Sequence, residues 1–389
     1  MYILKLPSTL FKSQNAWEQV EFGHKIYRRT KSEMSSNKLP GVEYEDINSG
    51  QGTLNKDITK KSIRKRGIFF QPFDVLFGKL RPYLKNWLYP NFKGVAVGDF
   101  WVLYSKLLEP SFIYGMIQTQ KFQNVANLSS GSKMPRSDWK LVSRTLFRFP
   151  MNKNEQRKIG LLLLNLDKTI TLHEEKHRQL ERLKKALLQK MFADKTGYLA
   201  LRFKGFTEKW EQEKLGNIIR QSSLKNNNYN YPILTSAHEG LVPQSTHFGS
   251  QQRHDTSDYN VIKPNQITYR NRSDDGRFTF NINKLNITGL VSKFYPVFSF
   301  ENTDNDFMVN NLNHNPQIKY DLDVLSVGTG QHVLSFTNLK KYEILAPSYV
   351  EQKRIGQFLL QLNRTITLHD KKIQYLKQLK RGLLQKMFV

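Results

Sequence analysis

The sequence has no cysteine among its 389 residues, and no apolar run approaches the roughly 18 residues that a membrane-spanning helix needs. The first absence excludes disulfides, zinc sites of the cysteine type and cysteine nucleophiles. Residues 1–12 hold lysine and proline within a short apolar stretch, which is not the pattern of a secretory signal. We therefore expect a soluble cytoplasmic protein.

Catalytic motifs are missing as well. The sequence has no GxxxxGK[ST] phosphate loop, no GxGxxG segment after a strand and no GxSxG nucleophile motif. An adenine methyltransferase is expected to carry an Asn-Pro-Pro-aromatic tetrad, and the nearest match is Asn315-Pro316-Gln317-Ile318. Acidic pairs such as Asp304 with Asp306 are more typical of turns than of a magnesium site. The sequence therefore contains no motif that indicates an enzyme of these classes.

Acidic residues are scarce, since 33 Asp and Glu face 60 Lys and Arg and leave a net charge of +27. The excess is uneven: residues 1–150 carry 24 basic against 11 acidic side chains, whereas residues 193–346 carry 17 against 15. A strongly basic surface attracts polyanions and indicates nothing about the fold. Nucleic acid is the leading partner class, with an ordinary solvated basic surface as the alternative.

Two segments repeat each other. Residues 155–192 and 351–388 align without a gap at an offset of 196, and more than half of their positions are identical. Upstream, Trp17-Glu18-Gln19 matches Trp210-Glu211-Gln212, while the intervening sequences have diverged. The chain is a tandem duplication. The two similar segments indicate helices with the same geometry. The two diverged segments, which we call the variable bodies, can bind different ligands.

Apolar residues in both repeated segments recur in steps of three and four, which predicts one long helix in each. A helix of 38 residues measures about 57 Å. We expect the two helices to pair antiparallel, with packing on another subunit as the alternative, and His173 with His369 to pack together at the crossing rather than to bind a metal. The candidate positions for helix pairing or partner docking are Ile159, Leu163, Leu166, Ile170, His173, Leu187, Met191, Phe192, Ile355, Leu359, Leu362, Ile366, His369, Leu383, Met387 and Phe388.

The variable bodies indicate an α+β fold, because segments rich in β-branched and aromatic residues alternate with turn signals. The expected strands are residues 68–77, 95–104, 261–269 and 289–300. Basic turns follow two of these strands, and a loop with small residues lies ahead of each long helix. Arginine at such a turn can pair with guanine or clamp a phosphate. The candidate DNA-binding residues are Lys60, Lys61, Arg64, Lys65, Arg66, Lys79, Arg81, Lys133, Arg136, Arg270, Arg272, Arg277, Gln331 and His332.

These motifs together resemble the specificity subunit of a Type I restriction-modification enzyme. The resemblance rests on the EQ(R/K)(K/R)IG helix starts, the TITLH and LLQKMF tracts, the two WEQ starts, and residues 74–83 and 328–336. It spans essentially the whole chain. One departure is that RFKGFTEK precedes Trp210, whereas residues 8–16 before Trp17 read STLFKSQNA. The sequence before the first WEQ start therefore differs from that before the second.

The resemblance implies two pseudo-symmetric mixed α/β target recognition domains, separated by two long helices that form an antiparallel coiled coil. Residues 1–150 and 210–346 would be these domains, 151–192 and 347–389 the conserved spacer helices, and 193–209 the linker. Each domain would read one half of a bipartite DNA site. Such a subunit has no catalysis of its own and binds no cofactor.

In the family, the specificity subunit binds double-stranded DNA and recruits two modification subunits and two restriction subunits. S-adenosylmethionine, ATP and magnesium belong to those partners, and no membrane is involved. Two other hypotheses stay open at this point. One is a single-chain methyltransferase or nuclease with its own recognition domains, against which the missing motifs argue. The other is a coiled-coil scaffold that binds proteins and carries incidental basic charge.

Overall fold

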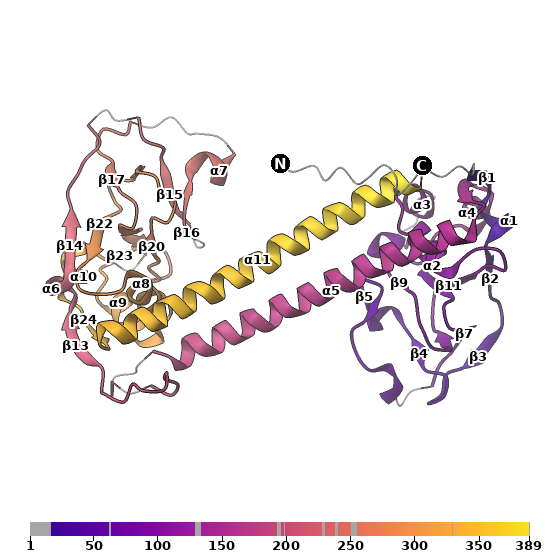
Figure 1. Ribbon diagram of the computed structural model, residues 1–389, viewed down its shortest axis with the longest axis horizontal. Helices are drawn as coiled ribbons and strands as arrows, with labels where there is room; N and C mark the ends of the chain where they lie inside the picture. Colours follow the sequence, from indigo (N-terminus) through magenta and orange to yellow (C-terminus); the bar gives the residue numbers. More distant parts are fainter. Residues whose placement is uncertain are drawn as a thin grey trace. The chain divides into compact units, whose positions relative to one another are not determined.

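The computed structural model describes residues 17–61, 64–128, 134–192, 196–197, 199–227, 230–237, 240–249, 255–328 and 330–388. The chain forms two compact units: unit 1 consists of Met1–Glu175 with His369–Val389, and unit 2 of Lys176–Leu368. Helices and strands are mixed in both units, so the predicted α+β class is confirmed (Figure 1). Among the described residues no helix is long and apolar enough to cross a membrane.

Unit 1 contains short strands and short helices around its part of two long helices, α5 (Lys153–Lys190) and α11 (Tyr349–Met387). Its strands are β1 (Trp17–Glu21), β2 (Tyr27–Arg28), β3 (Ser32–Met34), β4 (Gly41–Val42), β5 (Ile47–Asn48), β6 (Thr53–Leu54), β7 (Arg66–Phe70), β8 (Val75–Gly78), β9 (Trp87–Leu88), β10 (Gly94–Ala96), β11 (Phe100–Tyr104) and β12 (Leu146–Pro150). Its short helices are α1 (Phe22–Lys25), α2 (Pro110–Met116), α3 (Gln120–Ala126) and α4 (Trp139–Arg144). The main sheets have the strand orders β3-β7-β10-β4 and β2-β11-β8-β9.

Unit 2 is built in the same way. Its strands are β13 (Glu211–Lys214), β14 (Ile219–Ser222), β15 (Leu234–Ala237), β16 (Gly240–Pro243), β17 (Asn260–Ile262), β18 (Ile267–Tyr269), β19 (Arg272–Ser273), β20 (Phe280–Ile282), β21 (Gly289–Val291), β22 (Val297–Phe300), β23 (His332–Val333) and β24 (Glu343–Ala346). Its short helices are α6 (Leu215–Ile218), α7 (Gln244–Phe248), α8 (Asn305–His314), α9 (Pro316–Val324) and α10 (Phe336–Lys341). The largest sheet has the order β14-β22-β18-β20.

The duplication is visible in the pairing of strands as well as in the sequence. In unit 1 β1 pairs antiparallel with β12 and β8 with β11; in unit 2 β13 pairs antiparallel with β24 and β18 with β22. Helices α1 and α4 of unit 1 pack together, as do α6 and α10 of unit 2. The diverged bodies have therefore kept these pairings.

The expected strands are present, but each is broken in two. Residues 68–77 span β7 and β8, which lie in different sheets, and Phe73 between them has a left-handed φ of 69°. Gly98 (φ 97°) separates β10 from β11, and Asn265 (φ 65°) separates β17 from β18. Residues 289–300 divide into β21 and β22, which also lie in different sheets. A positive φ bends the chain sharply, so one segment can serve two sheets.

Each long helix is anchored at its start by a glutamine of the EQ motif. Gln156 Nε2 donates to Pro150 O (2.7 Å), and its Oε1 accepts from the backbone N–H of Glu109 (2.9 Å), the residue before α2. In unit 2, Gln352 makes the same two bonds to Pro347 O (2.9 Å) and from the N–H of Asp304 (3.0 Å) before α8. Both glutamines are buried. The repeated motif therefore fixes each long helix to the preceding strand and to a neighbouring helix.

Within unit 1 the start of α5 and the end of α11 run antiparallel, and Figure 1 shows them side by side there. Asp167 pairs with Lys380, and seven residues further along α5 Glu174 pairs with Lys377 (2.6 Å), which lies earlier in α11. Phe388 near the end of α11 stacks on Phe112 of α2 (5.0 Å between ring centroids). The predicted antiparallel pairing is confirmed for this part of the helices.

Candidate nucleic-acid interface

The two predicted DNA-binding loops of unit 1 lie next to each other. The backbone N–H of Arg81, in the turn after β8, donates to Pro135 O (2.7 Å), and that of Ser137 donates to Lys79 O (2.8 Å). Leu80 and Arg136 form an antiparallel bridge between these bonds. The basic turn and the loop ahead of α4 are thus one surface. Lys133, predicted in the same loop, lies outside the described residues.

Asp99 holds two of the predicted cations of this surface. It lies in the turn between β10 and β11, where Oδ1 is 3.3 Å from Lys79 Nζ and Oδ2 is 3.0 Å from Arg136 Nη2. Burial by itself would raise the pKa of Asp99, but hydrogen bonds from Arg136 and Lys79 outweigh it and hold the pKa below its ordinary value. Sequence reasoning missed Asp99, because residues 95–104 were expected to form one strand.

Arg81 is the cation of this turn that remains open to a ligand. Its side chain is exposed, and no ion pair joins it to a carboxylate within the described part of the chain. Its backbone is left-handed (φ 48°), as is that of Lys85 (φ 55°), and the two flank the 3-10 turn Pro82–Leu84. Left-handed backbone is unfavourable for residues with a Cβ and tends to occur at functional sites. Arg81 is therefore the strongest single candidate in unit 1.

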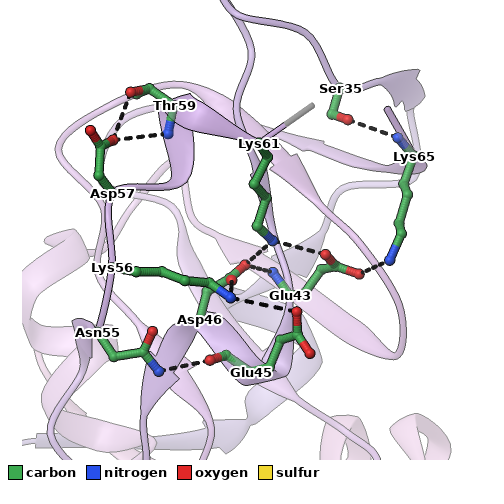
Figure 2. Close-up of polar contacts among 10 residues, drawn as sticks. All are labelled: Ser35, Glu43, Glu45, Asp46, Asn55, Lys56, Asp57, Thr59, Lys61 and Lys65. Carbon is green, nitrogen blue, oxygen red and sulfur yellow. Dashed lines mark hydrogen bonds and ion pairs between the residues drawn. The ribbon is translucent and has the colours of Figure 1, made fainter. Parts of the chain in front are cut away.

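Two lysines of the predicted basic cluster at residues 60–66 form ion pairs with a glutamate of the same unit, as Figure 2 shows. Lys61 Nζ lies 2.8 Å from Glu43 Oε2 and 2.6 Å from Asp46 Oδ2, and Lys65 Nζ lies 2.5 Å from Glu43 Oε1. Sequence reasoning treated all five cations alike. The other three, Lys60, Arg64 and Arg66, have exposed side chains, and only Lys60 among them has an ion pair in the described residues, at 3.6 Å from Asp57.

The acidic pair that binds these lysines belongs to the fold of unit 1. Asp46 has no exposed side-chain surface, and its Oδ2 accepts from the Glu43 N–H (2.6 Å) in a capping box around Tyr44–Asp46. Burial acts to raise the pKa values of both carboxyls, but hydrogen bonds led by Lys61 outweigh it and lower both. Lys61 therefore stabilises this loop rather than offering a free charge to a phosphate.

Unit 2 brings its two predicted loops together at the corresponding place. Arg272 of β19 pairs with Val333 of β23, and the N–H of Leu334 donates to Asn271 O (2.9 Å). The basic turn after β18 thus lies beside the loop that precedes α10, as the turn after β8 lies beside the loop that precedes α4. The structure places Arg270 and Arg272 on this surface with exposed side chains.

The remaining candidates of unit 2 differ in how far their side chains are already bound. His332 Nδ1 lies 2.8 Å from Asp323 Oδ1, and Arg277 Nε lies 3.7 Å from Asp275 Oδ2 with most of its side chain exposed. Gln331 is exposed next to His332. The sequence did not predict the pairing of His332 with Asp323, because the loop after α9 brings the two residues together only in the folded chain.

The apolar helix positions are buried within the units. Leu163, Leu166 and Ile170 share the core of unit 1 with Leu383 and Met387. Met191 and Phe192 share that of unit 2 with Ile355 and Leu359. Leu187 is only partly buried and Leu188 takes the core position, a shift of one residue from the prediction. Met191, Phe192, Leu383 and Met387 are therefore covered by other residues of the chain.

His173 and His369 meet as expected from their equivalent positions, with 3.0 Å between their Nδ1 atoms. The described residues contain no group of three or more histidine, aspartate or glutamate side chains arranged to hold a metal ion. Two imidazoles in contact on paired helices need no metal to account for them. The pair belongs to the helix packing of unit 1.

Residues 206–378 match the family described as the Type I restriction modification DNA specificity domain. The fold is similar to that of the S subunit of a Type I restriction-modification system from M. genitalium, with a TM-score of 0.60 and 13% identity over 97% of this chain and 98% of that chain.

Two further solved structures align with a TM-score of 0.47 each. One is the HsdS subunit from Thermoanaerobacter tengcongensis, 19% identical over 97% of this chain and 98% of that one. The other is a chain from a study of complex assembly and conformational transition of the type I R-M system, 17% identical over 95% and 97%. The match over residues 206–378 agrees with the resemblance that the sequence motifs indicated.

Proposed function

We propose that this chain is the non-catalytic subunit that selects the DNA sequence in a Type I restriction-modification complex, and that each unit reads one half of a bipartite site. The observation that carries the proposal is the repeated surface: in both units a basic turn after a central strand is bonded to the loop ahead of a short helix. Basic side chains on a ribbon-like edge suit the major groove of DNA. Residues 151–192 and 347–389 set the spacing between the half-sites.

The long helices also dock the two modification subunits. Leu172 of α5 and Leu368 of α11 occupy equivalent repeat positions, and both are 66% exposed. Leu162 and Phe358, again equivalent, are both 37% exposed. These equivalent exposed apolar positions on both helices support the proposed docking. The two restriction subunits join the assembled complex, and S-adenosylmethionine, ATP and magnesium are bound by the partners.

An exchange of domains tests whether each unit recognises one half-site. Residues 1–150 are replaced by the matching region of another specificity subunit, and the chimera is expressed with its modification subunit. Single-molecule methylation sequencing should then show one half-site altered, with the other half and the spacing unchanged. A reciprocal exchange of residues 210–346 should alter the other half only. Methylation in which either chimera changes both halves contradicts the proposal.

A charge on the exposed helix positions tests docking. Leu172→Glu together with Leu368→Glu should abolish co-purification of the chain with its modification subunit. Leu183→Glu is the matched control, since Leu183 is 48% exposed on α5 while its repeat copy Leu379 packs in unit 1. Equal recovery of the modification subunit with both variants contradicts docking at these positions.

A further inference from the structure

Arg272 is supported by an aromatic side chain rather than by a carboxylate. Its guanidinium carbon lies 4.4 Å from the ring centroid of Phe294, an aromatic side chain that is 42% exposed. Phe294 follows β21, in the stretch that was expected to be continuous strand. In the part of the chain that the structure describes, no carboxylate lies within ion-pair distance of Arg272.

Two cations nearby are bound to acids instead. Arg277 has Asp275 at 3.7 Å, and Lys293, beside Phe294, has Asp258 at 3.1 Å. A carboxylate occupies the N–H groups of a guanidinium, whereas an aromatic face supports the cation and leaves its N–H edge free. Arg272 is therefore oriented by the protein while its hydrogen-bond donors remain available.

The backbone of Arg272 is held by strand pairing. Arg272 and Ser273 pair with Val333 and His332 across the two-stranded ribbon of β19 and β23. A two-stranded ribbon is one of the elements that the major groove admits, and an arginine there pairs with O6 and N7 of guanine through two parallel hydrogen bonds. A phosphate contact carries no sequence information directly, and a lysine can also make it as a point charge. A bidentate contact with a guanine base, by contrast, requires the planar guanidinium group to be correctly oriented.

We infer that Arg272, supported by Phe294, reads one guanine in the half-site bound by unit 2. The inference rests on the proposed function. The exposed cations without such support, Arg270 among them, contribute charge toward the DNA backbone. Phe294 acts as a positioning residue, since it orients the arginine without contacting the base.

The test uses the full chain and a library of duplexes with randomised sequence. The enriched motif is compared between the natural chain and Arg272→Lys, which keeps the charge and loses the planar fork. We expect the preference for guanine at one position of one half-site to fall roughly tenfold to a hundredfold, with the other half-site unchanged. Phe294→Leu should weaken the same preference about two- to fivefold.

Arg220→Lys is the matched control, because Arg220 is 73% exposed in the same unit and paired with Glu301 at 2.7 Å. Its motif should equal that of the natural chain, and the melting curves of all variants should coincide. An unchanged motif with Arg272→Lys overturns the inference and leaves the proposed function intact. If the natural chain enriches no motif, the proposed function fails and the inference fails with it.

Discussion

Gly160 of α5 lies so close to Ser111 of α2 that a methyl group added at the glycine would be 2.6 Å from Ser111 Cβ. Its copy Gly356 in α11 has the same relation to α8, since an added methyl would be 3.0 Å from the Phe307 nitrogen. Carbon atoms that are not bonded do not approach to 2.6 Å. The glycine of the EQ(R/K)(K/R)IG motif is therefore a site of close helix approach.

Gly160→Ala and Gly356→Ala should each lower the free energy of unfolding, by about 1–3 kcal/mol, because the added methyl overpacks the contact. Gly382→Ala is the matched control in α11, where an added methyl meets nothing within 4 Å. It should raise stability by up to about 1 kcal/mol through helix propensity. Urea unfolding of the full chain measures all three, and a gain with Gly160→Ala would contradict the close approach.

The anchoring glutamines should be equally sensitive. Gln156→Met keeps the length of the side chain but leaves Pro150 O and the Glu109 N–H without their partners, and Gln352→Met does the same in unit 2. Each should cost about 1–3 kcal/mol, the penalty for unsatisfied buried polar groups. Gln189→Met, at an exposed position of α5, serves as the control. Thermal unfolding that does not separate Gln156→Met from Gln189→Met would refute the anchoring role.

DNA affinity should depend on which cations are already bound. Arg81→Ala removes an exposed charge and should reduce the slope of log K against log salt by about 0.9, the value for one phosphate contact, or abolish discrimination if Arg81 contacts a base. Lys61→Ala should leave the slope almost unchanged, because Lys61 is bound to Glu43 and Asp46. Fluorescence anisotropy on one duplex at several salt concentrations measures both. The reverse ranking would show that the acidic pair releases Lys61 to DNA.

Acid should weaken unit 1 through Glu43 and Asp46. Their pKa values are lowered in the folded chain, so their contribution is complete above the ordinary carboxyl pKa of about 4 and is lost as the pH falls through the lowered values. Asp46→Asn should therefore be less stable than the natural chain at pH 7, and the difference should shrink below about pH 4. Glu181→Gln, an exposed position of α5, should show no such convergence. Parallel stability curves for Asp46→Asn and the natural chain would contradict the role of the network.

Periodicity and repetition predicted the parts of the fold that are local. The steps of three and four in α5 and α11 depend only on which face is apolar, and the structure confirms that face with the exception of Leu187, whose place Leu188 takes. The breaks in the expected strands depend on backbone conformation rather than on apolar periodicity. Asn265 is a residue that tolerates left-handed backbone, but Phe73 is not, and no sequence signal marks it as a bend.

The candidate interface could be predicted only in part, for a similar reason. The sequence identified the basic turns, because cations after a strand are visible in the chain. It could not separate Arg81 from Lys79 or Lys61, since this difference depends on acids contributed by distant segments, Asp99 and Glu43. It also missed Phe294, because its proximity to Arg272 arises only when two turns fold together.

The contact between His173 and His369 has a consequence for the duplication itself. With 3.0 Å between the two Nδ1 atoms, one ring donates an N–H and the other accepts with its lone pair. Two copies of one residue that touch cannot hold the same tautomer when both rings are neutral. At this point the halves of a duplicated chain are chemically unequal even though their residues are identical. Nitrogen NMR of the two imidazoles would resolve one ring protonated at Nδ1 and one at Nε2.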